Sequence, residues 1–268
     1  LNMTQSAVSQ QIKSLEGHLG QILFHRRPRA LELTEAGMTY LPVVRDAFRT
    51  LMRGTRAITG AHQDVVQVQC NITFAVNWLA PRLPAFRATH PEVHLNVSTE
   101  LWEPREMAEG ADIEIRYSLR PGDTVRTERL RTDEYYPVCA PGFPVTLEDL
   151  YMQPLYDCSN VLCNWASWAE DQALTWPNPR ITYATTYLVS LSVAVAGGGL
   201  CLAHDTIART MLEDGRLIAP FRHRVPMDEA YYLLMSPQAE ESPGALAFAN
   251  WIRTTLAEEQ AAQPIAHR

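Results

Sequence analysis

The sequence predicts an α/β protein with a small N-terminal part and a larger C-terminal part. Three observations support this prediction. The first 61 residues combine an amphipathic helical pattern, a basic turn between two short apolar runs, and a long helical stretch. From residue 65 onward strands and helices alternate, which is typical of parallel sheets covered by helices. A chain of 268 residues is also too long for one small core, so we expect two or three domains.

The first predicted helix begins after Thr4, because a threonine hydroxyl can accept a hydrogen bond from a backbone N–H of the first helical turn. Apolar side chains then recur at helical spacing on one face, and Gly20 is the expected stop after the last of them. These apolar side chains are Val8, Ile12, Leu15 and Leu19.

The other face of this helix carries short and amide side chains together with a lysine. Such side chains suit base edges and phosphates in a major groove of DNA. An ordinary helix with a solvated polar face explains the same pattern, so the helix alone does not decide. The candidate DNA contacts on this helix are Thr4, Gln5, Ser6, Ser9, Gln10 and Lys13.

A basic turn follows the helix and favours the DNA-binding interpretation. The apolar pair at 23–24 leads into the segment His25-Arg26-Arg27-Pro28-Arg29, and the run 30–37 comes next. Strand, basic turn and strand together have the form of a wing, which can touch the DNA backbone or the minor groove. The candidate contacts are Arg26, Arg27 and Arg29.

Residues 35–61 are predicted to form one long helix, in which Pro42 is the only proline. About 27 residues would span roughly 40 Å. Apolar side chains at near-heptad spacing form one seam along it, and a helix with such a seam favours a partner helix. Pro42 is tolerated only with a local kink or near the helix start.

The formal charge is divided unevenly along the chain. Residues 1–62 hold eight Lys and Arg against four Asp and Glu, a formal +4, whereas the remainder holds fifteen against 26, a formal −11. The whole chain therefore carries the net −7 of its composition. This asymmetry lets the basic end meet nucleic acid while the acidic body does not.

Five scattered cysteines indicate reduced thiols in a cytoplasmic protein rather than a disulfide framework. We find no signal peptide pattern, and the longest apolar tract, 187–203, is interrupted by serines and glycines, so no membrane partner is expected. Redox switching by the two nearest cysteines, Cys158 and Cys163, is the less favoured alternative to plain packing. The cysteines are Cys70, Cys139, Cys158, Cys163 and Cys201.

No pattern for catalysis, metal binding or a cofactor stands out. The glycines at 197–199 precede a predicted strand rather than follow one, which indicates a helix stop and not a phosphate loop. There is no His-Glu-x-x-His, paired Cys-x-x-Cys or nucleophile elbow. We therefore expect neither an enzyme nor a metal site, and no cofactor.

The C-terminal part is predicted to alternate between the two element types. Its strands are expected at 65–74, 93–100, 111–117, 134–143, 181–187, 199–205, 216–221 and 230–237. Its longer helices are expected at 77–91, 188–198, 205–215 and 242–259, with a helix, a short strand and a further helix between 147 and 176.

The first 37 residues resemble the winged helix-turn-helix of LysR-type transcriptional regulators. The family would place a further segment before Leu1, so we expect an N-terminally truncated chain with a partial DNA-binding domain at 1–34 and a linker and dimerisation helix at 35–61. The matching residues are Thr4, Gln5, Ser6, Val8, Ser9, Ile12, Leu15, Glu16, Leu19, Gly20, Leu23, Phe24, Arg26, Leu33, Thr34 and Gly37.

The C-terminal part resembles the effector-binding domain of the same family along its whole length, most of all the branch with the glycine-cleavage activator and the β-lactamase regulator. The resemblance implies two lobes of the periplasmic-binding-protein type (type 2), with lobe one at 65–136 and 237–260 and lobe two at 137–236. The crossings between them are expected near Tyr136–Val138 and Tyr232–Leu234. Ser118 departs from the branch pattern, so the effector is expected to differ. The matching stretches are FAVNWLAPRLPAFRATHPEVHL, ADIEIRY, PVCAP, AVAGGGLCLA, GRLIAPF and YYLLMSP.

In such lobes small molecules bind near strand ends, helix N-termini and domain boundaries. The hydroxyl of Thr73 and nearby backbone N–H groups suit a carboxylate. Helix capping by Thr73, hinge packing by Tyr231, a surface position for Glu100 and a structural role for His204 are the simpler interpretations. The candidate effector contacts are Thr73, Asn77, Glu100, Arg116, Tyr117, Ser159, Thr186, Tyr187 and Tyr231.

The leading functional interpretation is a regulator that binds double-stranded DNA at a promoter operator as a homodimer or homotetramer. A small-molecule effector switches it by binding two states unequally, and the resemblance implies RNA polymerase as a further partner. A stand-alone small-molecule binding protein of the periplasmic type is the alternative. The missing signal peptide and the wing pattern argue against that alternative.

Overall fold

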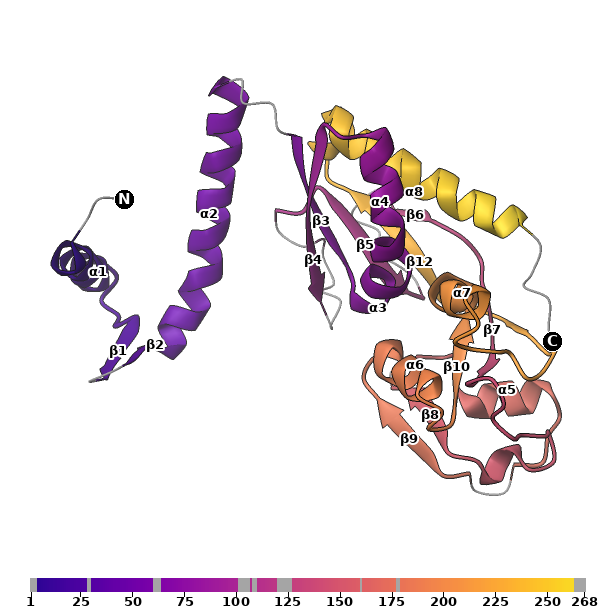
Figure 1. The fold of residues 1–268 in the computed structure, drawn as a ribbon. Coiled ribbons are helices and arrows are strands. Elements are labelled where there is room, and N and C mark those ends of the chain that lie inside the picture. Colours follow the sequence, from indigo (N-terminus) through magenta and orange to yellow (C-terminus); the bar gives the residue numbers. More distant parts are fainter. Residues whose placement is uncertain are drawn as a thin grey trace. The chain divides into compact units, whose positions relative to one another are not determined.

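The computed structural model describes residues 4–27, 30–59, 64–100, 107, 110–119, 127–159, 161–176 and 179–262. The chain divides into two units, residues 1–62 and 63–268 (Figure 1). The first unit contains α1 (Gln5–Leu19), β1 (Phe24–Arg27), β2 (Ala30–Leu33) and α2 (Glu35–Thr59). The finer division of this unit at residue 34 stays a prediction.

The bounds predicted for the first helix are confirmed. The hydroxyl of Thr4 accepts a hydrogen bond from the N–H of Ala7 over 3.3 Å, which caps α1 at its start. Gly20 follows α1 with a φ of 66°, and its N–H donates to the carbonyl of Glu16. A left-handed residue directly after the helix is the stop for which glycine is suited.

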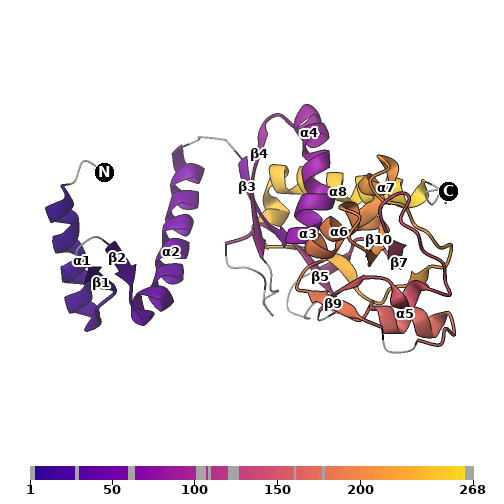
Figure 2. The same cartoon turned by 60° about the horizontal axis from the view of Figure 1, so that its bottom comes forward.

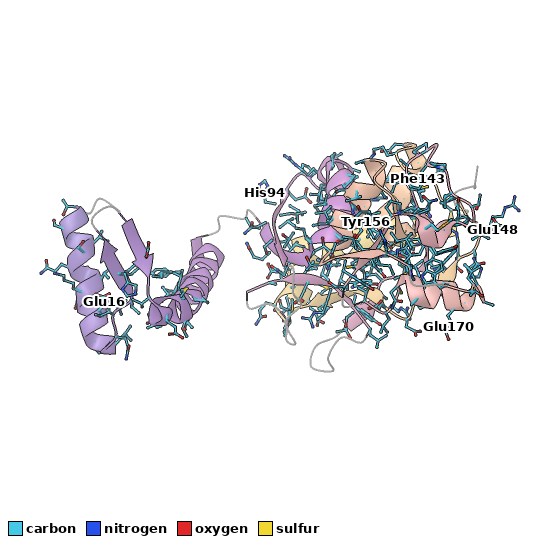
Figure 3. The ribbon with its side chains drawn as sticks, turned by 90° about the horizontal axis from the view of Figure 1, so that it is seen from below. Glu16, His94, Phe143, Glu148, Tyr156 and Glu170 are labelled. Atoms are coloured by element: carbon cyan, nitrogen blue, oxygen red, sulfur yellow. The ribbon has the colours of Figure 1, made fainter. Side chains whose placement is uncertain are left out.

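The predicted wing is an antiparallel hairpin of β1 and β2, in which Phe24 pairs with Leu33. The carboxylate of Glu16 accepts the N–H groups of Leu23 and Phe24 over 2.8 and 3.2 Å, and so fixes the start of the hairpin to α1 (Figure 3). Gly37 lies so close to this turn that a Cβ there would sit 2.2 Å from the carbonyl oxygen of Leu23. The glycine of the wing pattern is therefore required by close backbone contact.

The second unit contains two five-stranded sheets, seen from two directions in Figures 1 and 2. The first sheet has the order β4-β3-β5-β12-β6, with β3 parallel to both of its neighbours and β12 antiparallel to both of its own. Its strands are β3 (Asp64–Asn71), β4 (Val93–Glu100), β5 (Ile113–Ser118), β6 (Thr127–Arg129) and β12 (Ala230–Met235).

The second sheet has the order β11-β7-β10-β8-β9, with β8 parallel to β9 and β10 and with β7 antiparallel to β10 and β11. Mixed sheets of this kind confirm the predicted α/β class. Its strands are β7 (Glu134–Val138), β8 (Leu155–Cys158), β9 (Ile181–Ala184), β10 (Leu200–His204) and β11 (Val225–Pro226).

Helices connect the strands of each sheet, and a core of buried side chains from both sheets runs between them. α6 and α7 pack against β10, and α8 packs against β3. The helices are α3 (Ile72–Phe74), the π-helical η1 (Ala75–Leu79), α4 (Ala80–Thr89), η2 (Leu150–Met152), α5 (Trp165–Asp171), α6 (Tyr187–Val195), α7 (Asp205–Glu213), η3 (Ala239–Glu241) and α8 (Pro243–Ala261).

Several predicted strand bounds are wrong. The strand predicted at 65–74 ends at Asn71, because the Asn71 side chain accepts the N–H groups of Thr73 and Phe74 and starts a helix there. The strand predicted at 134–143 ends at Val138. The run 216–221 forms only an isolated bridge between Ile218 and Cys139 instead of a strand.

The two crossings between the sheets also lie elsewhere than predicted. β7 and β12 each lie within one sheet, so Tyr136–Val138 and Tyr232–Leu234 are ordinary strand residues. The chain instead changes sheet at 130–133 and at 227–229. Each crossing segment contains charged residues and directly precedes an apolar strand, β7 or β12, and the resemblance had placed the crossings within those strands.

Candidate functional site

Four aromatic side chains from both sheets of the second unit come together, and we call them the tyrosine cluster: Tyr117, Tyr187, His204 and Tyr231. The Tyr117 ring lies 5.1 Å from that of Tyr231, 6.2 Å from that of Tyr187, and stacks on His204 at 6.1 Å between centroids. His204 lies 5.8 Å from both Tyr187 and Tyr231. Three of the predicted effector contacts therefore share one cluster.

The strand registers explain why these side chains meet. Tyr117 on β5 and Tyr231 on β12 are direct partners across an antiparallel ladder, so their side chains share one face of the first sheet. Tyr187 begins α6, and His204 ends β10 of the second sheet. The cluster thus joins the two sheets at the strand and helix ends where small molecules bind in this architecture.

Glu229, in the second crossing segment, closes one side of the cluster. Its carboxylate accepts the hydroxyl of Tyr117 over 3.2 Å and the N–H of Leu162 over 3.1 Å, with Cys163 N–H at 3.4 Å. Burial, together with the charges of Tyr187 and Glu229, raises the pKa of Tyr117 well above its usual value. The Tyr117 phenol therefore stays protonated at neutral pH and acts as a hydrogen-bond donor.

The N-terminus of α6 faces this region without a side-chain cap. Thr186 occupies the cap position, but among the described residues its hydroxyl makes no capping hydrogen bond. An uncapped helix start presents backbone N–H groups and the positive end of the helix dipole. Thr186 and Tyr187 thus lie at a point that suits a negatively charged or carbonyl group of a ligand.

The region around Thr73 differs from the sequence-based expectation. The backbone N–H groups of Thr73 and Phe74 donate to Oδ1 of Asn71 over 2.9 and 3.4 Å, so they are not free for a carboxylate. Thr73 itself is buried, and Phe74 after it packs on Tyr231 at 4.9 Å. The short α3 also contacts α6 and α7, which places Thr73 at the junction of the two sheets.

Asn77 lies in the π-helical turn η1 and is buried. Its amide nitrogen Nδ2 has no hydrogen-bond partner among the described residues. A buried amide donor without an acceptor is costly and uncommon, and π-helical turns occur often at functional sites. Both observations favour Asn77 as a ligand contact.

Arg116, another predicted effector contact, is not brought to the tyrosine cluster. Arg116 alternates with Tyr117 along β5 and so points to the opposite face of the sheet, where its guanidinium binds Glu114 over 2.7 Å. The Ser159 hydroxyl donates to the Ala184 carbonyl over 3.0 Å. Glu100 ends β4, and its side chain lies outside the described residues.

Two acidic residues near the cluster were missed by the sequence interpretation. Asp133, in the first crossing segment, accepts hydrogen bonds from Nδ1 of His204 over 2.8 Å and from the N–H of Thr206 over 3.3 Å. Glu229 is the second. Each precedes an apolar strand within a short polar segment, and this position is the only signal that could have marked them.

The five cysteines are free thiols and buried. Burial, with the charges of Asp157 and Glu229, raises the pKa of Cys158 to about 12, and burial and Glu229 raise the pKa of Cys163 still higher. The thiolate is the reactive form of cysteine. This environment therefore argues against the redox alternative.

The candidate DNA contacts of the first unit lie on α1 and on the hairpin. The side chains of Thr4, Ser6, Gln10 and Lys13 are exposed, and Ser9 is half-buried. Gln5 belongs to α1, and Arg26 and Arg27 belong to β1, but their side chains lie outside the described residues, as does all of Arg29. The polar face predicted for α1 is thus accessible where it is described.

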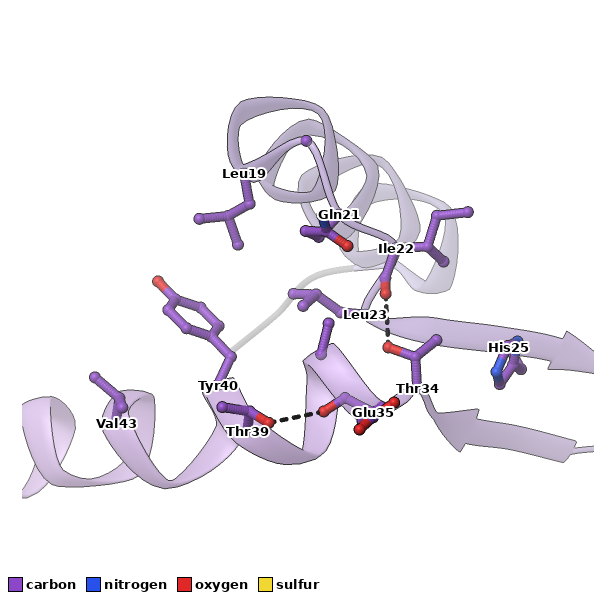
Figure 4. Close-up of a pocket in the computed structure, with 12 residues that line it drawn as sticks. Leu19, Gln21, Ile22, Leu23, His25, Thr34, Glu35, Thr39, Tyr40 and Val43 are labelled. Carbon is purple, nitrogen blue, oxygen red and sulfur yellow. Dashed lines mark hydrogen bonds between the residues drawn. The ribbon is translucent and has the colours of Figure 1, made fainter.

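An open apolar cavity of about 1000 Å³ lies between the end of α1, the turn after it and the start of α2 (Figure 4). The Thr34 hydroxyl donates to the Ile22 carbonyl over 2.6 Å at its edge, and Tyr40 and Val43 of α2 line it. Farther along α2, Leu51 of the predicted seam is more than 60% exposed, as is Phe48, which the prediction did not include. The apolar seam predicted for this helix is therefore not covered within the described unit.

Two family models match the chain. Residues 1–38 match the bacterial regulatory helix-turn-helix protein model of the lysR family, and residues 59–257 match the LysR substrate binding domain. The fold and the matches define a regulator with a helix-turn-helix and an effector-binding domain. The chain belongs to the LysR family of bacterial transcriptional regulators.

Named relatives agree with this assignment. The chain is 32% identical to the glycine cleavage system transcriptional activator of Escherichia coli (strain K12), over 97% of the chain and 88% of that protein. It is 34% identical to the transcriptional activator AmpR of Pseudomonas aeruginosa, over 97% and 89%. These relatives are transcriptional regulators and not enzymes.

Solved structures show the same fold. The effector domain of AmpR from Pseudomonas aeruginosa has a TM-score of 0.62 at 28% identity, covering 73% of the chain and 97% of that structure. Full-length AphB of Vibrio cholerae has a TM-score of 0.54 at 19% identity, covering 94% and 90%. Among the described residues, no helix is long and apolar enough to cross a membrane.

Proposed function

We propose that this regulator contacts operator DNA through the polar face of α1 and the basic turn of the hairpin. The exposed Ser6, Gln10 and Lys13 support this proposal, as does the excess of basic residues in the first 62 positions. In this arrangement Lys13 binds a phosphate, whereas Gln10 and Ser9 reach base edges. RNA polymerase is the further partner expected of a regulator bound at a promoter.

The protein acts as a homodimer or homotetramer through α2 in this proposal. Val43, Phe48 and Leu51 of α2 are each at least 60% exposed. Several large apolar side chains exposed on one helix favour a surface that packs against a partner. Pairing with the same helix of a second subunit would bury them. Two subunits would also present two copies of α1 to an inverted repeat.

The effector site of the proposal is the tyrosine cluster with Thr73, Asn77 and the start of α6 at Thr186. One observation supports this proposal most. Tyr117 and Tyr231 of the cluster belong to the first sheet, and Tyr187 begins α6, which packs against the second sheet, so the packing of the cluster depends on how the sheets are arranged. A ligand that binds one arrangement more tightly shifts the population toward it. That shift would change the DNA affinity in a cytoplasmic regulator.

A thermal-shift screen of small metabolites against the protein tests the effector site. We expect a metabolite that raises the melting temperature of the wild type and of Tyr183→Phe, because Tyr183 on β9 is 64% exposed and is not one of the cluster residues. The same metabolite should stabilise Tyr231→Phe and Asn77→Leu much less. Equal stabilisation of all four proteins would reject the site.

A parallel DNA-binding assay separates this function from the alternative of a stand-alone small-molecule binding protein. The affinity of the regulator for promoter DNA should rise or fall when that metabolite is added. A stand-alone binding protein would bind the metabolite in the same way and show no specific DNA binding.

A further inference from the structure

A second polar cavity, of about 350 Å³, lies apart from the tyrosine cluster. It is formed by the first crossing segment, by α7, by the segment before β11 and by the end of α8. Three arginines line it, with two carboxylates beside them. We call it the arginine pocket, and its principal residues are Arg131, Asp133, Asp205, Arg209 and Arg224.

The arginines of this pocket keep donors that nothing in the described chain accepts. Arg131 and Arg209 are only 7% and 5% exposed. The Nε and Nη1 atoms of Arg131, Nε of Arg209, and Nε and Nη2 of Arg224 have no hydrogen-bond partner among the described residues. Buried charged donors without acceptors are strongly destabilising and rare in native proteins.

The two carboxylates of the pocket are already engaged. Oδ2 of Asp133 accepts Nδ1 of His204 over 2.8 Å, whereas Oδ1 forms an ion pair with Nη2 of Arg131 at 2.9 Å and has no hydrogen-bond partner among the described residues. Asp205 binds Nη1 of Arg224 at 3.0 Å and Nη2 of Arg209 at 3.4 Å, and it also accepts the hydroxyl of Tyr136. Even with these contacts, the five arginine nitrogen atoms named above have no hydrogen-bond acceptor among the described residues.

The charge balance of the pocket favours an anion. Three guanidinium groups face two buried carboxylates, which leaves one positive charge in excess. Glu134 at the rim is exposed, and Glu213, 3.6 Å from Nη1 of Arg209, is 55% exposed. Water and salt screen the charges of such exposed groups far more than those of buried ones.

The guanidinium group of Arg224 is already held in one orientation without a ligand. Its guanidinium carbon lies 3.9 Å from the centroid of the Tyr136 ring, so the planar group is held by stacking as well as by Asp205. A fixed planar fork of N–H donors is the group that binds carboxylate and phosphate oxygens in pairs. The cavity is also large enough for a small organic acid.

We propose that the arginine pocket is a second ligand site, which binds a small anion through a carboxylate or phosphate group. The anion accepts the free N–H groups of Arg131, Arg209 and Arg224. Because these residues come from the crossing segment and from the second lobe, the bound anion holds those parts together.

This site is connected to the tyrosine cluster through one carboxylate. Asp133 binds Arg131 in the pocket and His204 in the cluster. An anion that draws Arg131 toward itself changes how Asp133 holds His204. Binding in the pocket and binding in the cluster are therefore coupled, and the coupling is reciprocal.

Isothermal titration calorimetry of the protein with inorganic phosphate, and separately with succinate, tests the proposal. Titrations are made at constant ionic strength set with chloride. We expect saturable binding at one site per chain for at least one of the two probes. The probe that binds tells whether the group recognised is a phosphate or a carboxylate.

Variants locate the site. Arg131→Gln and Arg209→Lys should each weaken binding by about tenfold or more, because each loses charge-assisted or paired hydrogen bonds. Arg209→Lys keeps the charge and carries the test if circular dichroism shows that Arg131→Gln does not fold. Arg216→Gln, an exposed arginine paired with Asp214, should bind as the wild type does.

Two results would overturn the proposal. One is the absence of saturable binding with both phosphate and succinate. The other is binding that Arg209→Lys leaves unchanged, or that Arg216→Gln weakens equally, since the anion would then bind at another place or to the general charge of the surface.

Discussion

Nδ1 of His204 donates a hydrogen bond to Oδ2 of Asp133 over 2.8 Å, and this buried pair joins β10 to the first crossing segment. Burial alone would raise the pKa of Asp133, but the hydrogen bond and charge of His204 and the charge of Arg131 lower it to about 2. The carboxylate is therefore ionised at neutral pH, so the proton of this bond belongs to His204. The pair holds the first crossing segment against the end of β10.

Asp133→Asn should lower the free energy of unfolding by about 3 kcal/mol, because it leaves buried cationic donors without their partner. Urea denaturation followed by circular dichroism measures this loss. The matched control is Asp171→Asn, which breaks a half-exposed pair with His223 at 2.6 Å and should cost less than about 1 kcal/mol. Similar losses in the two variants would contradict the structural role of Asp133.

Asp157 should make stability depend on pH in the opposite direction to most acids. Burial raises its pKa from 3.8 to about 6, although the N–H groups of Trp165 and Cys158 act to lower it. The folded state thus holds the proton more tightly than the unfolded state. This contribution is complete below about pH 4 and is lost as pH rises through about 6, by up to about 3 kcal/mol.

Urea unfolding of the wild type and of Asp157→Asn across pH 4 to 7 measures this effect as a difference in pH slope. The variant cannot titrate at this position, so its stability should fall less over the interval. Parallel curves for the two proteins would show that Asp157 is ionised in the folded state well below pH 6.

The features that the sequence predicted correctly are those that depend on residues close together in the chain. The cap at Thr4, the stop at Gly20 and the hairpin rest on neighbours in the chain, and all three are confirmed. Strand periodicity also predicted most of the strands. Such signals need no knowledge of the partner strand, which is why they can be identified from one sequence.

The remaining errors concern long-range arrangement. Arg116 and Tyr117 are neighbours in sequence, but strand alternation sends them to opposite faces, and only the sheet order shows which face meets the second lobe. The crossings, placed from the resemblance within two strands, lie a few residues earlier, where the chain changes from one sheet to the other. Asp133 and Glu229 acquire their roles from partners more than 60 residues away.

Lys13→Gln should weaken binding to specific and unrelated DNA by a similar factor, because the lysine is proposed to bind a phosphate and not a base. The slope of log affinity against log salt should fall by about 1 for each subunit. Fluorescence anisotropy at several salt concentrations measures both. Arg87→Gln, exposed on α4, should leave the slope unchanged; an unchanged slope in Lys13→Gln would remove Lys13 from the interface.

The buried thiols should react slowly with iodoacetamide at neutral pH, since the pKa of Cys158 is raised to about 12 and that of Cys163 still further. Mass spectrometry of the native protein should find little labelling of any cysteine, while the protein unfolded in guanidinium chloride should be labelled fully. Rapid native labelling of Cys158 or Cys163, blocked by prior peroxide, would instead restore the redox alternative.

The central claim is that this LysR-family chain is a DNA-binding regulator whose affinity for DNA changes when an effector binds at the tyrosine cluster. The most direct test measures binding of the protein, as its gene encodes it, to the DNA upstream of that gene and to a scrambled duplex, over a range of salt concentrations. We predict specific, salt-dependent binding of the upstream DNA, which the effector shifts in the wild type and shifts much less in Tyr231→Phe. Equal and weak binding of both duplexes at low salt would contradict the account.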